Sequence, residues 1–134
     1  MPISKRQLEE LVKEPLVAVL ATVNPDGTPQ ATPLWYHYDG ECFITTCFAR
    51  RVKIRNIKEN PNMTLVIGDT AHNGRGMIVR ENAELVEDNV PAATLKNAIR
   101  YEGEERGRKS AAELTTGGAR YIIRIMPHRI LYGE

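Results

Sequence analysis

The clearest chemical signal in the sequence is a run of basic side chains near its middle. Between Thr45 and Lys58 no residue is acidic. The basic residues of this stretch are Arg50, Arg51, Lys53, Arg55 and Lys58. Because the whole chain of 134 residues has a formal net charge of only +1, positive charge is concentrated here. Such side chains bind anions, and each charge-assisted hydrogen bond contributes roughly 1.5–3 kcal/mol. We therefore expect a binding site for a phosphate-like group.

The elements expected around this stretch place its charges at the start of a helix. Residues 42–46 are rich in β-branched and aromatic side chains and predict a strand. Apolar residues at Val52, Ile54 and Ile57 then indicate a short helix, which the following Asn-Pro pair ends. The first turn of a helix has unpaired N–H groups, and its dipole favours an anion by roughly 0.3–1 kcal/mol.

Two other interpretations of the same charges remain open. Arg51, Arg55 and Lys58 lie at i, i+4 and i+7, which is also the pattern of a solvated helix face. A nucleic-acid surface is the third interpretation, and the near-neutral chain and the lack of interleaved aromatic residues disfavour it.

The composition predicts a single domain, residues 1–134, of ordinary globular type. The chain is 42% hydrophobic and 26% charged. No apolar run approaches the roughly 20 residues of a membrane span, and the N-terminus does not resemble a signal peptide. Cys42 and Cys47 would point to opposite sides of one strand, so we expect two reduced thiols rather than a disulfide, and a cytoplasmic protein.

The remaining pattern predicts mostly strands. Ser4 and Gln7 form a capping box before a helix that reaches Val12. Residues 16–23 are almost continuously apolar, which favours a strand buried on both faces. Pro29 and Pro33 cannot donate to a ladder, so the extended segment 28–38 should be an edge or a bulge. Later strands are expected at residues 63–69, 76–87 and 120–126, with a continuation at 129–132. A second longer helix starts after residue 89, and residues 102–109 form a charged, exposed segment. Hairpin-linked strands with few helices predict a mainly β domain, an antiparallel barrel or roll with helical inserts.

No set of residues indicates catalysis by the protein's own side chains. His37, His72 and His128 have no metal-ligand spacing with one another or with the cysteines, so no metal site is predicted. The nucleophile-elbow, P-loop and dinucleotide-binding motifs are absent from the sequence. No catalytic residue can be assigned, and the chemistry of an enzyme of this sequence would reside in a bound cofactor.

The order of the motifs resembles a known family. Ala-Thr-Val and Asn-Pro-Asp-Gly are followed by Pro-Gln-Ala-Thr-Pro-Leu-Trp-Tyr, Tyr-Asp-Gly, Phe-Ile-Thr-Thr and Arg-x-Lys-x-x-Asn. This order is similar to that of the pyridoxamine 5′-phosphate oxidase-like superfamily, especially its small members that bind FMN or the deazaflavin F420. The resemblance implies a split antiparallel β-barrel of Greek-key-like topology with a few short helices. It also implies a homodimer with cofactor sites at the subunit interface.

The resemblance also implies which residues contact the cofactor. Those matched to the phosphate and ribityl chain are Thr45, Thr46, Arg51, Lys53 and Asn56, and Lys53 is the principal phosphate ligand. Those matched to the strand beside the ring are Pro33, Leu34, Trp35 and Tyr36, although Trp35 could equally belong to the core. Arg129 matches a C-terminal contact, and Arg50 and Arg55 would meet the longer acidic tail of F420.

The sequence departs from the vitamin B6 oxidases in two places. The aromatic and basic residues that those oxidases use near their C-terminus for pyridoxal phosphate are not recognisable in this chain. Typical FMN-binding members carry an arginine a few residues before the position of Trp35, where this chain has Gln30-Ala31-Thr32. Oxidation of pyridoxamine phosphate is therefore not expected. The leading hypothesis is a flavin- or deazaflavin-dependent oxidoreductase that transfers a hydride between FMN, or alternatively F420, and a small organic substrate. A flavin-binding protein without turnover, used for storage or sensing, is the alternative, and a nucleic-acid-binding small barrel is the third hypothesis.

Overall fold

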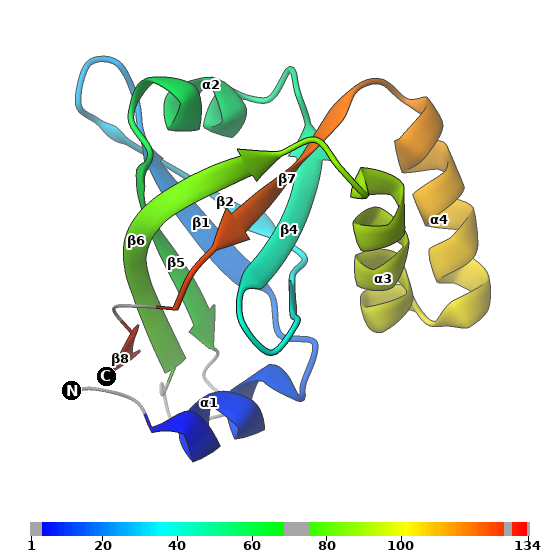
Figure 1. The fold of residues 1–134 in the computed structure, drawn as a ribbon, viewed down its shortest axis with the longest axis horizontal. Helices are drawn as coiled ribbons and strands as arrows, with labels where there is room; N and C mark the ends of the chain where they lie inside the picture. The colour runs from blue at the N-terminus through cyan, green and yellow to red at the C-terminus, as the bar shows by residue number, and fades with distance from the viewer. Residues whose placement is uncertain (1–3, 69–75, 128–129, 134) are drawn as a thin grey trace.

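The protein is mainly β, as the sequence predicts, and its sheet is curled into a split barrel (Figure 1). The computed structural model describes residues 4–68, 76–127 and 130–133. Within these residues the helices are α1 (Lys5–Val12), α2 (Val52–Glu59), α3 (Val90–Glu102) and α4 (Glu104–Thr116). The strands are β1 (Ala18–Val23), β2 (Pro29–Leu34), β3 (His37–Tyr38), β4 (Phe43–Phe48), β5 (Asn62–Gly68), β6 (Gly76–Val86), β7 (Arg120–Ile125) and β8 (Ile130–Gly133).

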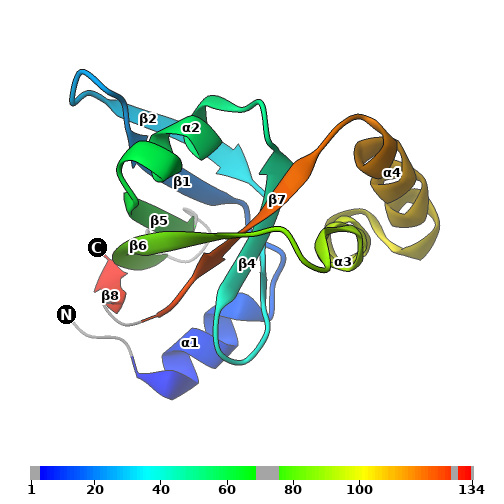
Figure 2. The same ribbon diagram turned by 45° about the horizontal axis from the view of Figure 1, so that its top comes forward.

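The long strand β6 joins the two halves of the sheet. The strand order is β2-β1-β5-β6-β7-β4-β3, with β8 also paired to β6, and every pairing is antiparallel. Residues 76–82 of β6 pair with β5, whereas residues 83–86 pair with β7. Because one strand serves both halves, its bend in Figures 1 and 2 curls the sheet around a common core.

The main core lies inside this curl, and the helices cover different parts of it. Leu8 and Leu11 of α1 join the same apolar cluster as residues of β1, β4, β5, β6 and β7. The helix α2 contributes Ile54 and Ile57. In contrast, α3 packs on the outer side of β4 and β7, where Val90 contacts a separate small cluster, and α4 packs on α3 (Figure 2).

Several local signals in the sequence act as expected. The Ser4 hydroxyl accepts a hydrogen bond from the Gln7 N–H at 3.1 Å and the Gln7 side chain accepts one from the Ser4 N–H at 2.9 Å, which completes the capping box of α1. Gly27 adopts a φ of +88° in the predicted turn before β2. The proline-bearing β2 is an edge strand, and α2 starts and stops within a residue or two of its predicted limits.

Two expectations were wrong, and one helix was not predicted. The strand at residues 16–23 is buried on one face only, because no described element covers the other face and Val19 remains 38% exposed. Residues 102–109 are charged and mostly exposed, as predicted, but residues 104–116 form the helix α4, which was not predicted. The last strand, β8, pairs with β6 instead of extending β7, because Pro127 separates it from β7.

Two further observations bear on the predicted class of protein. Cys42 and Cys47 are both free thiols, and they lie in different apolar clusters, as their spacing predicts. None of the helices that the structure describes is long and apolar enough to cross a membrane.

Candidate functional site

A pocket of about 290 Å³ opens where the basic helix meets the sheet and the α3–α4 pair. Its wall comes from the end of β2, its floor from the end of β4 and the start of β7, and its remaining sides from α2, α3 and α4. The residues that line it are Pro33, Leu34, Trp35, Thr46, Cys47, Phe48, Arg51, Lys53, Thr94, Asn97, Leu114 and Arg120.

Three cations converge on this pocket without a carboxylate partner. Among the described residues, none of the ion pairs includes Arg51, Lys53 or Arg120. Burial lowers the pKa of Lys53, and the neighbouring Arg51 lowers it further. Burial is also the main cause that lowers the pKa of Arg120, with Arg51 and Arg50 adding to the effect. The pocket therefore holds uncompensated positive charge that an anion would neutralise.

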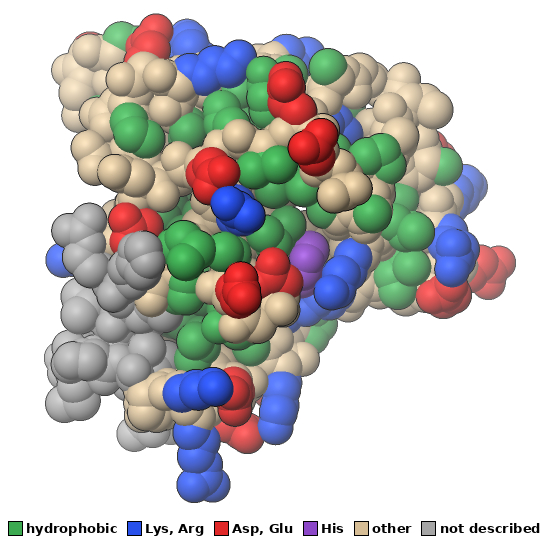
Figure 3. Space-filling model, viewed as in Figure 1, with side chains coloured by type: hydrophobic (Ala, Val, Ile, Leu, Met, Phe, Trp, Pro, Cys, Tyr) green, Lys and Arg blue, Asp and Glu red, His purple; other side chains and the backbone are tan. Residues whose placement is uncertain are grey.

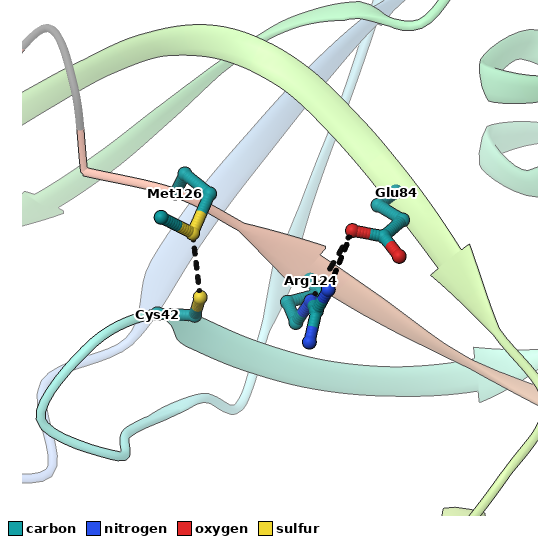
Figure 4. Close-up of polar contacts among 4 residues, drawn as sticks. All are labelled: Cys42, Glu84, Arg124 and Met126. Atoms are coloured by element: carbon teal, nitrogen blue, oxygen red, sulfur yellow. Dashed lines mark hydrogen bonds and ion pairs between the residues drawn. The ribbon is translucent and has the colours of Figure 1, made fainter.

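Arg120 has a hydrogen-bonding group available for such an anion. Its Nη2 donates to the Thr46 hydroxyl at 2.9 Å, but its buried Nε has no partner in the described structure. Arg124, four residues further along the same face of the strand, is bound instead to Glu84 at 2.8 Å and is exposed (Figure 4). The two arginines of β7 thus differ in that only Arg120 lines the pocket, whereas Arg124 is paired with a carboxylate.

The ring of Phe48 holds the cations together. The guanidinium of Arg50 lies 4.1 Å from the ring centroid, that of Arg120 lies 4.5 Å away, and that of Arg51 lies 5.7 Å away. Arg50 itself donates to the carbonyl of Gly117 at 3.2 Å and does not line the pocket. Cation–π contacts offset part of the repulsion among these like charges.

The start of α2 adds backbone donors on the same side. Arg51 is the N-cap of this helix, its backbone is extended, and no side chain caps the first turn. The first N–H groups of α2 therefore remain available to an anion, and the helix dipole has its positive end there. Lys53, in the same turn, is half-buried and lines the pocket.

The opposite wall is built where the chain changes strand partners. Leu34 still pairs with Ala18 of β1, whereas His37 already pairs with Ile44 of β4. Between them, the carbonyl of Trp35 accepts a hydrogen bond from the Thr45 hydroxyl at 2.6 Å. Trp35 is half-buried, lines the pocket and belongs to neither apolar core cluster, and its contact with a cofactor remains a prediction.

The structure brings six of the predicted cofactor residues to this one pocket, namely Pro33, Leu34, Trp35, Thr46, Arg51 and Lys53. Thr45 lies behind it, holding the Trp35 carbonyl. Tyr36 is fully buried in the core, where burial raises the pKa of its phenol to about 12. Arg50 and the exposed Arg55 lie outside the lining, and Arg129 lies outside the described residues. Their roles toward a cofactor remain predictions.

Asn56 has a structural use that the sequence did not suggest. Its side chain is fully buried and donates to the Thr22 hydroxyl at 3.1 Å and to the Asn24 side-chain carbonyl at 2.9 Å. These bonds fasten α2 to the end of β1. Asn56 does not line the pocket, so its predicted contact with a cofactor remains a prediction.

Sequence reasoning missed six residues that line the pocket. Two of them, Cys47 and Phe48, follow Thr46 at the end of β4. The others come from distant elements and are Thr94, Asn97, Leu114 and Arg120. Asn97 is buried, and its side-chain oxygen lies 2.7 Å from Nδ1 of His37 while its amide donates to the Ile44 carbonyl at 3.3 Å. Burial raises the pKa of the Cys47 thiol despite the cations near it. The one signal for Arg120 was its place at the start of the strand predicted at residues 120–126, and it was not used.

Comparisons with known proteins place this geometry in context. Residues 4–132 match the family described as pyridoxamine 5′-phosphate oxidase. A solved structure named F420 reductase is 33% identical, with 98% of each chain covered and a TM-score of 0.75. A conserved hypothetical protein from Mycobacterium tuberculosis is 23% identical over 100% of this chain and 86% of its own, with a TM-score of 0.83. The heme storage protein HutZ from Vibrio cholerae is 16% identical over 96% and 94%, with a TM-score of 0.74, and shares the fold. No protein of curated function matches the sequence.

Proposed function

The chain belongs to the pyridoxamine 5′-phosphate oxidase family, and from this premise we propose that it is an oxidoreductase whose pocket binds F420, with FMN as the alternative. The family consists mostly of flavin- and F420-dependent oxidoreductases. F420 is preferred because the similar protein at 33% identity is named F420 reductase, and because Arg50 adds a cation just outside the pocket. The sequence alone favoured FMN.

The observation that carries this proposal is the set of unpaired cations at one end of the pocket. Arg51, Lys53 and Arg120 have no carboxylate partner among the described residues, and the buried Nε of Arg120 has no acceptor. A phosphate ester would supply the missing acceptors and charge. The donor set therefore fits the phosphate end of either cofactor.

The other residues of the pocket fit a planar ring rather than a second anion. Pro33, Leu34 and Trp35 present backbone and apolar surface, and Leu114 approaches from α4. The bound cofactor would supply hydride transfer to or from a small organic substrate. The chain's own residues would hold the phosphate, orient the ring against the β2 wall and exclude water from it.

We propose further that two copies of the chain form a dimer that completes the site. The outer face of β1 and β5 is apolar and uncovered by the described residues: Val19 pairs directly with Val66, and they are 38% and 41% exposed. Val19 also pairs with Pro33, which lines the pocket. An interface on this face would therefore continue to the pocket and close its open side.

The alternatives differ in the support that they receive from the described residues. A flavin-binding protein without turnover would use the same pocket, so only an activity assay separates it from an oxidoreductase. Heme storage would need an axial ligand, and the described His37 is buried with its Nδ1 on Asn97. A nucleic-acid surface needs a broad basic patch. On the face shown in Figure 3, Lys and Arg alternate with Asp and Glu. A cytoplasmic location remains a prediction.

The decisive test is the absorption spectrum of the purified protein, with mass spectrometry of any compound that heat releases, and titration of ligand-free protein with F420 and FMN. Uptake of F420 with the spectrum of a deazaflavin is the expected result. Arg120→Met should weaken uptake roughly 10-fold or more, since it removes charge-assisted bonds, whereas Arg124→Met on the same strand should not. Protein that takes up neither cofactor would refute the proposal. Uptake without turnover of any acceptor from a broad panel would leave the storage role.

A further inference from the structure

The last turn of α3 contacts the backbone of the pocket wall. Arg100 donates through Nη1 to the Tyr36 carbonyl at 2.5 Å and through Nη2 to the carbonyls of Val12 and Glu14 at 2.7 and 2.9 Å. Tyr101 donates its phenolic hydrogen to the Leu16 carbonyl at 2.6 Å. Two consecutive residues of one helix thus fasten the α1–β1 connection and the segment between β2 and β3.

These bonds satisfy backbone groups that the sheet leaves unpaired. Tyr36 lies between β2, which pairs with β1, and β3, which pairs with β4, so it belongs to neither ladder. Its N–H donates to the Tyr101 hydroxyl at 3.3 Å, and its carbonyl is held by Arg100. Without the helix, both groups of this buried residue would lack a protein partner. The backbone of Tyr36 is therefore held by α3, whereas the neighbouring carbonyl of Trp35 is held by Thr45 of β4.

The same helix end also holds the side chain that faces the pocket. The indole of Trp35 stacks on the ring of Tyr101 with centroids 5.4 Å apart and planes 11° from parallel. The guanidinium of Arg100 lies 4.6 Å from the Tyr36 ring centroid and 5.2 Å from that of Tyr101. Neither Arg100 nor Tyr101 lines the pocket. They can act on a ligand only through the wall.

We propose that Arg100 and Tyr101 are positioning residues that hold the Pro33–Trp35 wall at a fixed distance from the cation side of the pocket, Arg51, Lys53 and Arg120. The part of this inference that concerns cofactor affinity rests on the proposed function. A ligand with a ring and a phosphate must reach both sides at once. Free phosphate needs only the cations. A displaced wall therefore weakens binding of the whole ligand and leaves the affinity for phosphate unchanged.

The test uses Tyr101→Phe, which keeps the ring under Trp35 and removes the phenol that bonds Leu16 and Tyr36. The matched control is Tyr38→Phe, which also loses one phenol–carbonyl bond, here of 3.0 Å to Gly40 in the hairpin. Trp35 is the single tryptophan of the chain, so its fluorescence reports on the wall directly. We expect acrylamide to quench Trp35 more efficiently in ligand-free Tyr101→Phe than in wild type, and equally in Tyr38→Phe and wild type.

The second readout compares two ligands. Tyr101→Phe should bind F420 or FMN about 3- to 10-fold more weakly, the equivalent of one lost hydrogen bond, and should bind inorganic phosphate as wild type does. If Tyr101→Phe does not fold, the same quenching and binding measurements are made on Arg100→Lys. This variant keeps the positive charge but loses the forked donors of the guanidinium group.

The outcomes separate this inference from the proposed function. If wild-type protein takes up neither cofactor, the proposed function is refuted. The quenching of Trp35 alone would then test whether Arg100 and Tyr101 position the wall. Unchanged quenching of Trp35 would overturn the inference in every case. An equal loss of affinity for phosphate and for the cofactor would also overturn it, because a general loosening of the fold would explain both.

Discussion

Replacing Lys53 by Met should weaken ligand binding while leaving the stability of the ligand-free protein unchanged or higher. Lys53 is half-buried at the start of α2 and has no carboxylate partner among the described residues. Burial and the nearby Arg51 lower its pKa, which means that the folded protein disfavours its charged form. The methionine side chain keeps the apolar stem and removes the ammonium group. The removal of the ammonium group should therefore weaken the binding of an anion without weakening the fold.

The size of the binding effect follows from the position of the ammonium group. A charge-assisted hydrogen bond to a phosphate in a partly desolvated pocket contributes roughly 1.5–3 kcal/mol, which corresponds to about 10- to 150-fold in Kd. A fully exposed ion pair would contribute only about 0–1 kcal/mol. The free energy of unfolding should stay within about 0.5 kcal/mol of wild type or rise, because no folded-state partner of Lys53 is lost.

The assay pairs calorimetric titration with F420, FMN and inorganic phosphate with urea unfolding of the ligand-free protein. The matched control is Lys58→Met on the same helix, where the exposed ammonium lies 5.0 Å from the Tyr121 ring centroid and outside the pocket. Lys58→Met should leave all affinities unchanged. The reasoning is refuted if Lys53→Met binds the ligands as wild type does, because Lys53 would then not contact them. It is also refuted if the loss of stability exceeds about 1 kcal/mol, because Lys53 would then serve the fold.

Three further predictions concern the elements that hold the pocket. Gly107→Ala should destabilise the α3–α4 pair by about 1–3 kcal/mol in urea unfolding, because a Cβ at Gly107 would lie 2.6 Å from the backbone of Ile99. Asn56→Ala should lower the free energy of unfolding by about 1–3 kcal/mol, since it removes two buried hydrogen bonds between α2 and β1. His37 has a pKa below its ordinary 6.5, chiefly through burial, with Lys96 and Arg100 adding to the effect and Asn97 and Asp39 opposing it. The unfolded chain then binds this proton more readily, so stability should decline as the pH falls from about 6.5 to the lower folded pKa, and the decline should be shallower in His37→Gln.

Each of these expectations has a contrary outcome. A Gly107→Ala variant as stable as wild type would mean that α4 shifts on α3 without cost. Full stability of Asn56→Ala, together with weaker cofactor binding, would return Asn56 to the role that the family resemblance implies. The same pH dependence in His37→Gln and wild type would show that other groups cause the acid sensitivity.

The sequence predicted best the features that depend on neighbouring residues. The Ser4–Gln7 capping box, the proline-bearing edge strand and the basic helix after β4 all depend on contacts or dihedral angles within a few residues. Arg51 and Lys53 were identified for the same reason, since both belong to the first turn of that helix. The helix α4 was missed because its apolar stripe is weak. Its acidic first turn and the Glu104–Arg108 pair at i, i+4 were the signals available.

What the tertiary structure alone decided is which distant residues meet the basic helix. Arg120 reaches the pocket because β7 pairs with β4 in the register that sets Phe48 opposite Arg120, and Asn97 and Leu114 reach it because the α3–α4 pair packs beside β4. Strand register and helix packing are set by the fit of whole surfaces, so residues some seventy positions apart leave no pattern in a local window. The sequence by itself determined a mainly β chain with a basic helix after β4. The packing of the sheet and helices placed the start of this helix at one end of a pocket, because only the folded chain brings β2, β7 and α3 next to it.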